Sequence, residues 1–255
     1  AVGAGRAVGA PTMTPLTVGS LFSGIGGFDL GLERAGMTVK WQVEIDPYCL
    51  KVLEKHWPHV TRYTDIKAVK WEAVEPVDLI CGGFPCQPVS VAGKREGTAD
   101  ERWLWPEFVR CLSVLRPRYV LIENVPGLFT AGFEHVVSDL AALRYDAEWQ
   151  TLSACAFGAP HARERLFLVA YPVGEFSITE EGRDLDWKIF YQEQRTESAD
   201  ENRRCTWWEA EPALSRVAHG IPAATHRRPR LGNAVVPQVV EWIGKRIMAQ
   251  EVLAL

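Results

Sequence analysis

A cysteine lies where its thiol could act as a nucleophile. Residues 82–87 read Gly-Gly-Phe-Pro-Cys-Gln and follow the apolar run Val77–Cys81. The glycines let the backbone turn sharply after a buried strand, and the prolines on either side of Cys86 stiffen its position. A thiol held in this way can be stabilised as the thiolate, the form that attacks electrophilic carbon. Cys81, inside the run itself, is expected to pack as a small hydrophobe.

A carboxylate ends a second apolar run further along the chain. Residues 119–125 read Tyr-Val-Leu-Ile-Glu-Asn-Val, so Glu123 comes at the end of a predicted strand. The carboxyl ends of parallel strands meet at one edge of a sheet, where ligands bind. The sequence therefore predicts one active site that combines the thiol of Cys86 with the carboxyl group of Glu123.

A glycine-rich segment follows the first apolar run. Residues 21–28 read Leu-Phe-Ser-Gly-Ile-Gly-Gly-Phe, and glycines at a helix start let the backbone approach a ligand closely. The spacing is not the full dinucleotide fingerprint, and a plain tight turn explains it equally well. The next run, however, ends in Glu44, about 20 residues on, where a ribose hydroxyl would bind. Together the two features favour a cofactor that contains adenosine.

Strands and helices must alternate to position these groups. Short apolar runs alternate with segments of helical periodicity from residue 17 to residue 171. This order predicts an α/β fold, a doubly wound and mostly parallel sheet that is covered on both faces. The expected strands are Thr17–Phe22, Val39–Ile45, Val77–Cys81, Arg118–Glu123, Glu148–Leu152 and Leu166–Tyr171, and the expected helices are Phe28–Ala35, Pro47–His56, Leu104–Leu115, Phe133–Leu143 and an amphipathic helix ending near Met248.

Composition and charge describe a globular protein. The 255 residues can bury one core, or one core and a small lobe, and an apolar content of 47% with a charged content of 24% excludes disordered and fibrous classes. A net charge of −4 does not by itself indicate nucleic-acid binding. Basic clusters at residues 94–102 and 226–230 could supply a local binding surface, although a solvated surface explains each equally well. The six cysteines form no Cys-x-x-Cys pair, which favours a reducing compartment over a zinc site or disulfides.

Five motifs, taken in chain order, make the sequence resemble the DNA (cytosine-5) methyltransferase family of the compact bacterial or phage type. They are FSGIGG at 22–27, GFPCQ at 83–87, ENV at 123–125, RER at 163–165 and GNAVVP at 232–237. The resemblance implies a Rossmann-like sheet that binds S-adenosyl-L-methionine. It also implies methyl transfer to carbon 5 of a flipped-out cytosine in a short duplex DNA site, with S-adenosyl-L-homocysteine as product.

The resemblance also implies a role for each catalytic residue. Cys86 would add to carbon 6 of the cytosine and make carbon 5 nucleophilic, and Glu123 would hydrogen-bond the ring nitrogen N3 and the exocyclic amine. Arg163 and Arg165 match an arginine motif, in which one arginine would contact the base carbonyl or hold the catalytic loop. His161 stands where the family usually has glutamine, so one supporting contact of this motif would differ.

The methyl donor would lie along the strand ends, according to the same resemblance. Glu44 would bind the ribose, Ile45 would pack on the adenine face, and Asp65 would bind the adenine amino group; taken alone, Asp65 is a turn or N-cap residue. The complete expected donor site is Phe22, Ser23, Gly24, Ile25, Gly26, Glu44, Ile45, Asp65, Ile66, Gly83, Pro85, Leu104, Asn233 and Ala234.

The resemblance implies double-stranded DNA as the partner, with no metal and no membrane, and a monomer or weak dimer in the cytoplasm of a bacterium or phage-infected host. The loop Val89–Trp103 is expected to close over flipped DNA. Changing Arg102 to alanine should weaken DNA binding more than donor binding. The expected DNA contacts are Gln87, Ser90, Lys94, Arg95, Arg102 and Arg228.

Four segments are expected along the chain. Residues 1–15 form a flexible Ala/Gly extension without an export signal, and no apolar run is long enough to span a bilayer. Residues 16–171 form the catalytic and cofactor-binding domain. Residues 172–230, charged and interrupted by tryptophans, form a target-recognition region that is short for this family. Residues 231–255 return to the catalytic domain.

Two other functions remain open at this point. A methyltransferase for tRNA cytosine would use the same chemistry, and a relative that binds DNA without turnover would use the same fold. The sequence does not specify the target site or a role in restriction-modification, orphan methylation or phage protection.

Overall fold

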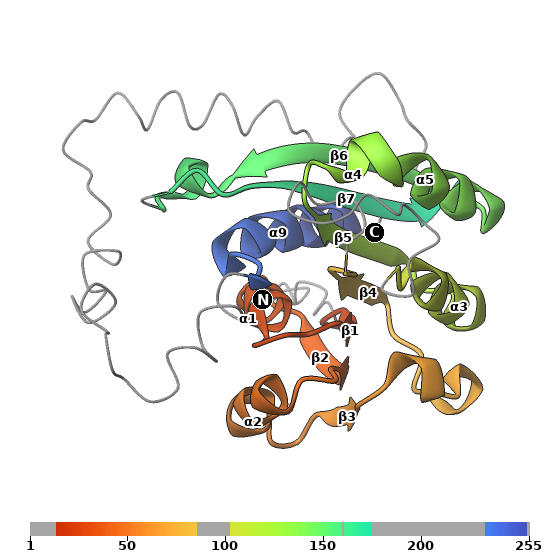
Figure 1. The fold of residues 1–255 in the computed structure, drawn as a ribbon, viewed down its shortest axis with the longest axis vertical. Coiled ribbons are helices and arrows are strands. Elements are labelled where there is room, and N and C mark those ends of the chain that lie inside the picture. Colours follow the sequence, from red (N-terminus) through yellow and green to blue (C-terminus); the bar gives the residue numbers. More distant parts are fainter. Residues whose placement is uncertain (1–13, 86–102, 160, 175–232, 254–255) are drawn as a thin grey trace, which may run out of the picture.

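A computed structural model of the 255-residue chain describes residues 14–85, 103–159, 161–174 and 233–253. Within these ranges the chain forms a seven-stranded sheet with helices on both faces (Figure 1). The expected α/β fold with a mostly parallel sheet is therefore confirmed.

The strand order in the sheet is β3-β2-β1-β4-β5-β7-β6. Neighbours from β3 to β5 run parallel, whereas β7 is antiparallel to both β5 and β6. The parallel part places the carboxyl ends of β1, β2, β4 and β5 at one edge. The strands are β1 Thr17–Leu21, β2 Thr38–Val43, β3 Thr61–Tyr63, β4 Leu79–Gly82, β5 Tyr119–Asn124, β6 Tyr145–Ser153 and β7 Glu164–Pro172.

Most helices lie where the apolar periodicity predicts them. Proline in the first turn begins both α2 and α3, where its missing N–H costs nothing. The last helix is longer than expected and continues to Leu253. The helices are α1 Gly27–Arg34, α2 Pro47–His56, α3 Trp105–Leu115, α4 Leu128–Ala131, α5 Phe133–Ala142 and α9 Pro237–Leu253, with 3-10 turns η1 Ile66–Ala68, η2 Trp71–Ala73 and η5 Ala154–Phe157.

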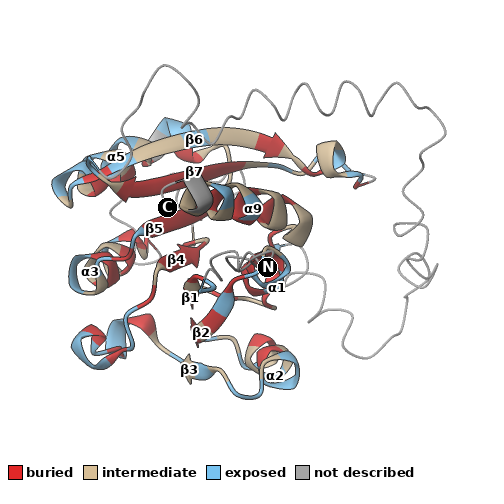
Figure 2. Ribbon diagram, turned by 180° about the vertical axis from the view of Figure 1, so that it is seen from behind, coloured by how far each residue is buried: buried red, intermediate tan, exposed pale blue. Residues whose placement is uncertain are grey.

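Two hydrophobic cores cover opposite faces of the sheet. Alternate residues of one strand belong to different cores, because successive side chains in a strand point to opposite faces. On β4, Ile80 joins the core formed with α3 and α5, whereas Leu79 and Cys81 join the core formed with α1 and α9. Figure 2 shows the central strands buried along most of their length. Cys81 is fully buried, as expected, and burial raises the pKa of its thiol well above the ordinary value.

The C-terminal helix α9 packs against the first helix α1 (Figure 1). Close contact requires glycine on α1, because a Cβ at Gly31 would lie 2.6 Å from both the Pro237 carbonyl oxygen and the Val240 Cβ. Near the C-terminal end of α9, Glu251 accepts hydrogen bonds from both Nη atoms of Arg118, at 2.7 and 2.8 Å, and from the Tyr119 hydroxyl at 2.7 Å. This packing brings the residues just before α9 to the glycine-rich start of α1.

Asp29 is a fully buried carboxyl group in the first turn of α1. Its two oxygens accept hydrogen bonds from Gln42 Nε2 at 2.7 Å and from Ser20 Oγ at 3.1 Å. Burial raises its pKa from 3.8 to about 6, and the two hydrogen bonds limit this rise. Through these hydrogen bonds, the carboxyl group connects the first turn of α1 to β1 and β2.

The raised pKa of Asp29 predicts a pH dependence of stability. The folded state binds the proton of Asp29 more tightly than the unfolded chain does. The resulting contribution to the free energy of unfolding is complete below about pH 4 and is lost as the pH rises through about 6. A shift of about two pKa units corresponds to roughly 3 kcal/mol. We expect urea titrations to show this extra fall in unfolding free energy between pH 4 and 6.5 in the wild type and not in Asp29→Asn. Equal pH slopes in the two proteins would contradict the assignment.

Candidate active site

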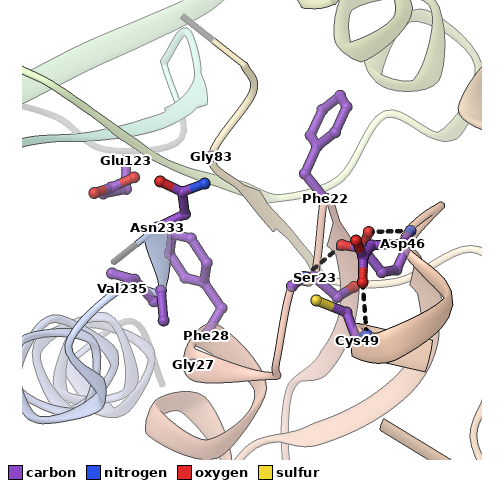
Figure 3. A pocket seen from close by; sticks show the side chains of 13 residues that line it. Phe22, Ser23, Gly27, Phe28, Asp46, Cys49, Gly83, Glu123, Asn233 and Val235 are labelled. Atoms are coloured by element: carbon purple, nitrogen blue, oxygen red, sulfur yellow. Dashed lines mark hydrogen bonds between the residues drawn. The ribbon is translucent and has the colours of Figure 1, made fainter. Parts of the chain in front are cut away.

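A cavity of about 410 Å³ opens at the carboxyl ends of the parallel strands. We call it the central cavity. Figure 3 shows Glu123 and Asn233 on one side of it and Phe22 and Asp46 on the other. Its lining residues, which come from five separate parts of the chain, are Phe22, Ser23, Gly24, Gly27, Phe28, Glu44, Asp46, Cys49, Gly83, Glu123, Asn233, Ala234 and Val235.

A second hollow of about 530 Å³, the outer cavity, shares Phe22 and Glu44 with the central cavity. Its wall includes Ile45, which is 69% exposed, and the carboxylate of Asp65. An exposed apolar surface beside a carboxylate suits a flat heterocycle that carries an amino group. The remaining lining residues are Val43, Thr64, Ile66, Lys67, Pro85 and Leu104.

The carboxylate of Glu44 lies between these cavities and links the turn after β1 to the turn after β2. Its Oε2 accepts a hydrogen bond from the Gly24 amide and its Oε1 accepts one from the Asp46 amide, both at 2.7 Å. Each carboxylate oxygen has a second lone pair that can accept from a ligand hydroxyl. Gly26, at the N-cap of α1, has a φ of 87°. A Cβ at this position would lie 2.4 Å from the Trp57 ring, so the turn requires glycine for both reasons.

Glu123 lies at the end of β5 against the backbone of Gly83. A Cβ on Gly83 would lie 2.9 Å from Glu123 Oε2, so the carboxyl group occupies the space that a side chain there would take. The neighbouring Asn124 strengthens this contact between strand ends, because its Nδ2 donates to the Phe84 carbonyl oxygen at 3.2 Å. Cys86, three residues after Gly83, lies outside the described residues.

An aromatic cluster brings together the residues that come just before and just after residues 86–102 in the chain. The ring of Phe84 lies 5.3 Å from that of Trp103 and 5.2 Å from that of Trp105, measured between ring centroids. Phe84 and Trp103 are both buried, so these contacts belong to the core. The chain therefore leaves β4 and enters α3 at neighbouring points beside the outer cavity, which Pro85 and Leu104 line.

Two arginines determine the electrostatics of Glu123. Arg165 Nε lies 3.0 Å from Glu123 Oε1, and within the described part of the chain that oxygen has no hydrogen bond of good geometry. Burial raises the pKa of Glu123, and the charges of Arg165 and Arg163 oppose this rise. Burial and the charge of Arg165 lower the pKa of Arg163. Glu123 is thus a carboxyl group that can hold a proton more readily than an exposed glutamate.

The structure distributes the predicted site residues over three hollows. The first two contain most of the predicted donor residues. The third, of about 1020 Å³, lies behind the glycine-rich turn and is lined by Ile25, Gly26, His161 and Arg163 among others. The predicted residues Cys86, Gln87, Ser90, Lys94, Arg95, Arg102 and Arg228 lie outside the described residues.

Several lining residues were missing from the sequence prediction. Asp46 is one, although the sequence Asp46-Pro47 is a typical helix start. Its Oδ1 accepts from the amides of Tyr48 and Cys49 at 2.9 and 3.0 Å, which places Cys49 in the wall. Val235 lies within the motif at 232–237 but was not among the predicted site residues, because its place in the wall depends on the packing of α9 against α1.

The described residues offer no group of three or more His, Cys, Asp or Glu side chains that could hold a metal ion. Nor does any helix among them combine the length and the apolar character needed to cross a membrane. The described residues of the site supply carboxylates, arginines, backbone amides and apolar walls. This combination suits an organic ligand with both polar and flat apolar parts.

Comparison with known proteins gives the family. Residues 16–205 match the family described as C-5 cytosine-specific DNA methylase. The chain belongs to this family. The resemblance inferred from the five motifs is thereby confirmed, and the family generally uses S-adenosylmethionine.

Type II methyltransferases are among the curated relatives of this chain. M.NgoMIV of Neisseria gonorrhoeae is 37% identical over 153 residues, which cover 58% of this chain and 49% of the relative. M2.BsuMI of Bacillus subtilis (strain 168) is 34% identical over 194 residues, which cover 72% of this chain and 47% of the relative. The chain thus spans about half the length of these curated relatives.

Solved structures show the same fold. The structure of a protein described as a DNA modification methyltransferase encoded within an E. coli prophage has a TM-score of 0.52 and 30% identity, and the match covers 62% of this chain and 47% of that chain. Dnmt2 methyltransferase of S. pombe has a TM-score of 0.54 and 25% identity, covering 64% and 53% respectively.

Proposed function

We propose that this chain transfers a methyl group from S-adenosyl-L-methionine to carbon 5 of a cytosine in duplex DNA. The observation that carries the proposal is the contact of the Glu123 carboxyl group with Gly83, three residues before Cys86, at the wall of the central cavity. Because β4 and β5 are neighbours in the sheet, a nucleophile that follows Gly83 by three residues in the chain would act together with Glu123 on one pyrimidine ring. Family membership supports the same chemistry.

The two cavities together fit the donor. We infer that the outer cavity takes the adenine, with Ile45 against its face and Asp65 at its amino group, since both line this cavity. Glu44 lies between the cavities and would accept from the ribose hydroxyls. The methionine end would lie in the central cavity, near Gly24 and Asn233. When bound, the donor supplies an electrophilic methyl group on a sulfonium.

The residues of this chain would make carbon 5 nucleophilic. The thiolate of Cys86 would form a bond to carbon 6 of the cytosine, and the electrons of the 5,6 double bond would then be available at carbon 5. Glu123 would donate a hydrogen bond at N3 as charge develops there, which its raised pKa favours. Arg165, beside Glu123, would hold that carboxyl group and face the ring carbonyl. After transfer, a base would remove the carbon 5 proton, the electrons of that C–H bond would re-form the 5,6 double bond, and the bond from carbon 6 to sulfur would break to return the Cys86 thiolate.

DNA recognition is proposed for segments that lie outside the described residues. Gln87, Ser90 and the basic residues at 94–102 would contact the extruded base and its phosphates, and residues 172–230, including Arg228, would read the target. The C-terminal segment would complete the donor cavity, which the position of Asn233 and Ala234 in its wall supports.

A methyl-transfer assay tests the proposed function. We expect label from S-adenosyl-L-methionine carrying a tritiated methyl group to enter cytosine in duplex DNA, with bisulfite sequencing giving the target site. Transfer to tRNA and not to duplex DNA would replace the proposal with a tRNA methyltransferase. Binding of DNA without transfer to either substrate would indicate a non-catalytic relative.

Replacement of Glu44 by glutamine should weaken binding of S-adenosyl-L-homocysteine by about tenfold or more. Glutamine has one acceptor oxygen, so its amide nitrogen would face either the Gly24 or the Asp46 amide, which now donate to the carboxylate. Isothermal titration calorimetry measures the change. Glu54→Gln, on the exposed face of α2, is the matched control and should bind normally. An unchanged affinity of Glu44→Gln would rule out the ribose assignment.

A further inference from the structure

Arg110, on helix α3, donates two hydrogen bonds to a turn that is remote in sequence. Its Nη1 donates to the Val69 carbonyl oxygen at 2.9 Å and its Nη2 donates to the Ile66 carbonyl oxygen at 2.6 Å. Both acceptors belong to the segment around η1. A planar guanidinium with two parallel N–H groups can hold two carbonyls at a fixed separation, which the single ammonium group of lysine cannot.

The remaining contacts of Arg110 set the orientation of this guanidinium. Its Nε donates to Glu107 Oε2 at 2.8 Å, one turn earlier on α3. Its Cζ lies 5.8 Å from the ring centroid of Trp71, and Trp71 is fully buried. The side chain is therefore held by a carboxylate on one side and by an aromatic ring that belongs to the core.

The turn that Arg110 holds forms one wall of the outer cavity. Residues 64–67 line this cavity, and Asp65 begins η1 by accepting from the Lys67 amide at 2.9 Å. Leu104, the residue immediately before α3, forms another part of the wall of the same cavity. Arg110 thus links the two walls, because it belongs to the helix that follows one wall and binds the backbone of the other.

We propose that Arg110 is a positioning residue for the purine end of the methyl donor. It fixes the η1 turn relative to α3 and so sets the separation between Asp65 and Leu104, without touching the donor itself. This inference rests on the proposed function, whose donor it places in the outer cavity. The loss of one or both charge-assisted hydrogen bonds would let the turn move, and the cavity would then no longer be preformed for a purine.

Binding measurements on Arg110→Lys test the proposal. We expect its affinities for S-adenosyl-L-homocysteine and for adenosine, measured by calorimetry well below the unfolding midpoint, to fall by the same factor of about tenfold. Adenosine lacks the methionine portion, so an equal loss assigns the effect to the purine and ribose end. Arg116→Lys is the matched control, since Arg116 is an exposed residue at the end of α3 that lies over the Tyr145 ring. It should bind both ligands normally.

A second variant keeps the test independent of folding. Glu107→Gln leaves the guanidinium in place and weakens only the contact that orients it, so a smaller loss, of about two- to fivefold, is expected for both ligands. Normal binding by Arg110→Lys, with or without a lower unfolding midpoint, would overturn the proposal, as would a loss restricted to S-adenosyl-L-homocysteine. Absence of S-adenosyl-L-homocysteine binding by the wild type would instead overturn the proposed function.

Discussion

Replacement of Cys86 by serine should abolish methyl transfer while leaving donor binding intact. A serine hydroxyl is a far weaker nucleophile than a thiolate at neutral pH, so carbon 6 would no longer be attacked, and a loss of roughly a thousandfold or more is expected. The measurements are label transfer to duplex DNA and calorimetry with S-adenosyl-L-homocysteine. Cys155→Ser is the matched control, because Cys155 is an exposed free cysteine on η5, and it should retain activity.

A covalent adduct gives a direct readout of the same residue. Duplex DNA that contains 5-fluorocytosine should trap the wild-type protein in a complex that survives denaturing electrophoresis, because fluorine at carbon 5 cannot leave as a proton does. Cys86→Ser should give no such complex. Loss of donor binding in Cys86→Ser, or an adduct that persists in it, would contradict the role assigned to this thiol.

Replacement of Glu123 by glutamine should lower the turnover number by about 10² to 10⁴ with little change in donor affinity. Glutamine has nearly the same size but cannot hold the proton that the buried carboxyl group would present to N3. It would also place an amide, in place of the carboxyl group, beside the Arg165 guanidinium, which lies 3.0 Å from Glu123 Oε1. Single-turnover kinetics with duplex DNA measures the effect on the chemical step.

The exposed residue Glu134, on α5, provides the control for this change. Glu134→Gln should have wild-type turnover and donor affinity. A Glu123→Gln variant with wild-type turnover would contradict the proposed part of the carboxyl group in catalysis. Equal losses of turnover and of donor affinity would show that Glu123 supports the donor cavity instead.

Local sequence patterns predicted the elements whose side chains have a clear periodicity. The apolar runs that became β1, β2, β4 and β5 lie within a few residues of their predicted bounds. The strand β3, Thr61–Tyr63, was missed because three residues of mixed exposure show no periodic pattern. The antiparallel direction of β7 was also beyond sequence reasoning, since strand direction depends on how the chain returns to the sheet.

The residues of the candidate site divide in the same way, into those that local sequence predicted and those that it did not. Glycine-rich turns and carboxylates at strand ends are visible in the sequence, and Phe22, Glu44 and Glu123 do line one cavity. Phe28 and Val235 line it as well, and the sequence analysis did not select them although both lie in or next to its motifs, because apolar residues there are also expected to pack in the core. The roles of all these residues in binding and catalysis remain predictions that the substitutions above test.

The sequence by itself determined the family, the alternation of strands and helices, and the chemical groups that end the strands, because motifs and periodicity are properties of short segments. Only the tertiary structure decided which of these groups meet. The contact of Glu123 with Gly83 requires β4 and β5 to be neighbours in the sheet, and the approach of Asn233 to the glycine-rich turn requires α9 to pack on α1. Both depend on burial of apolar surface between distant segments, which no local pattern specifies.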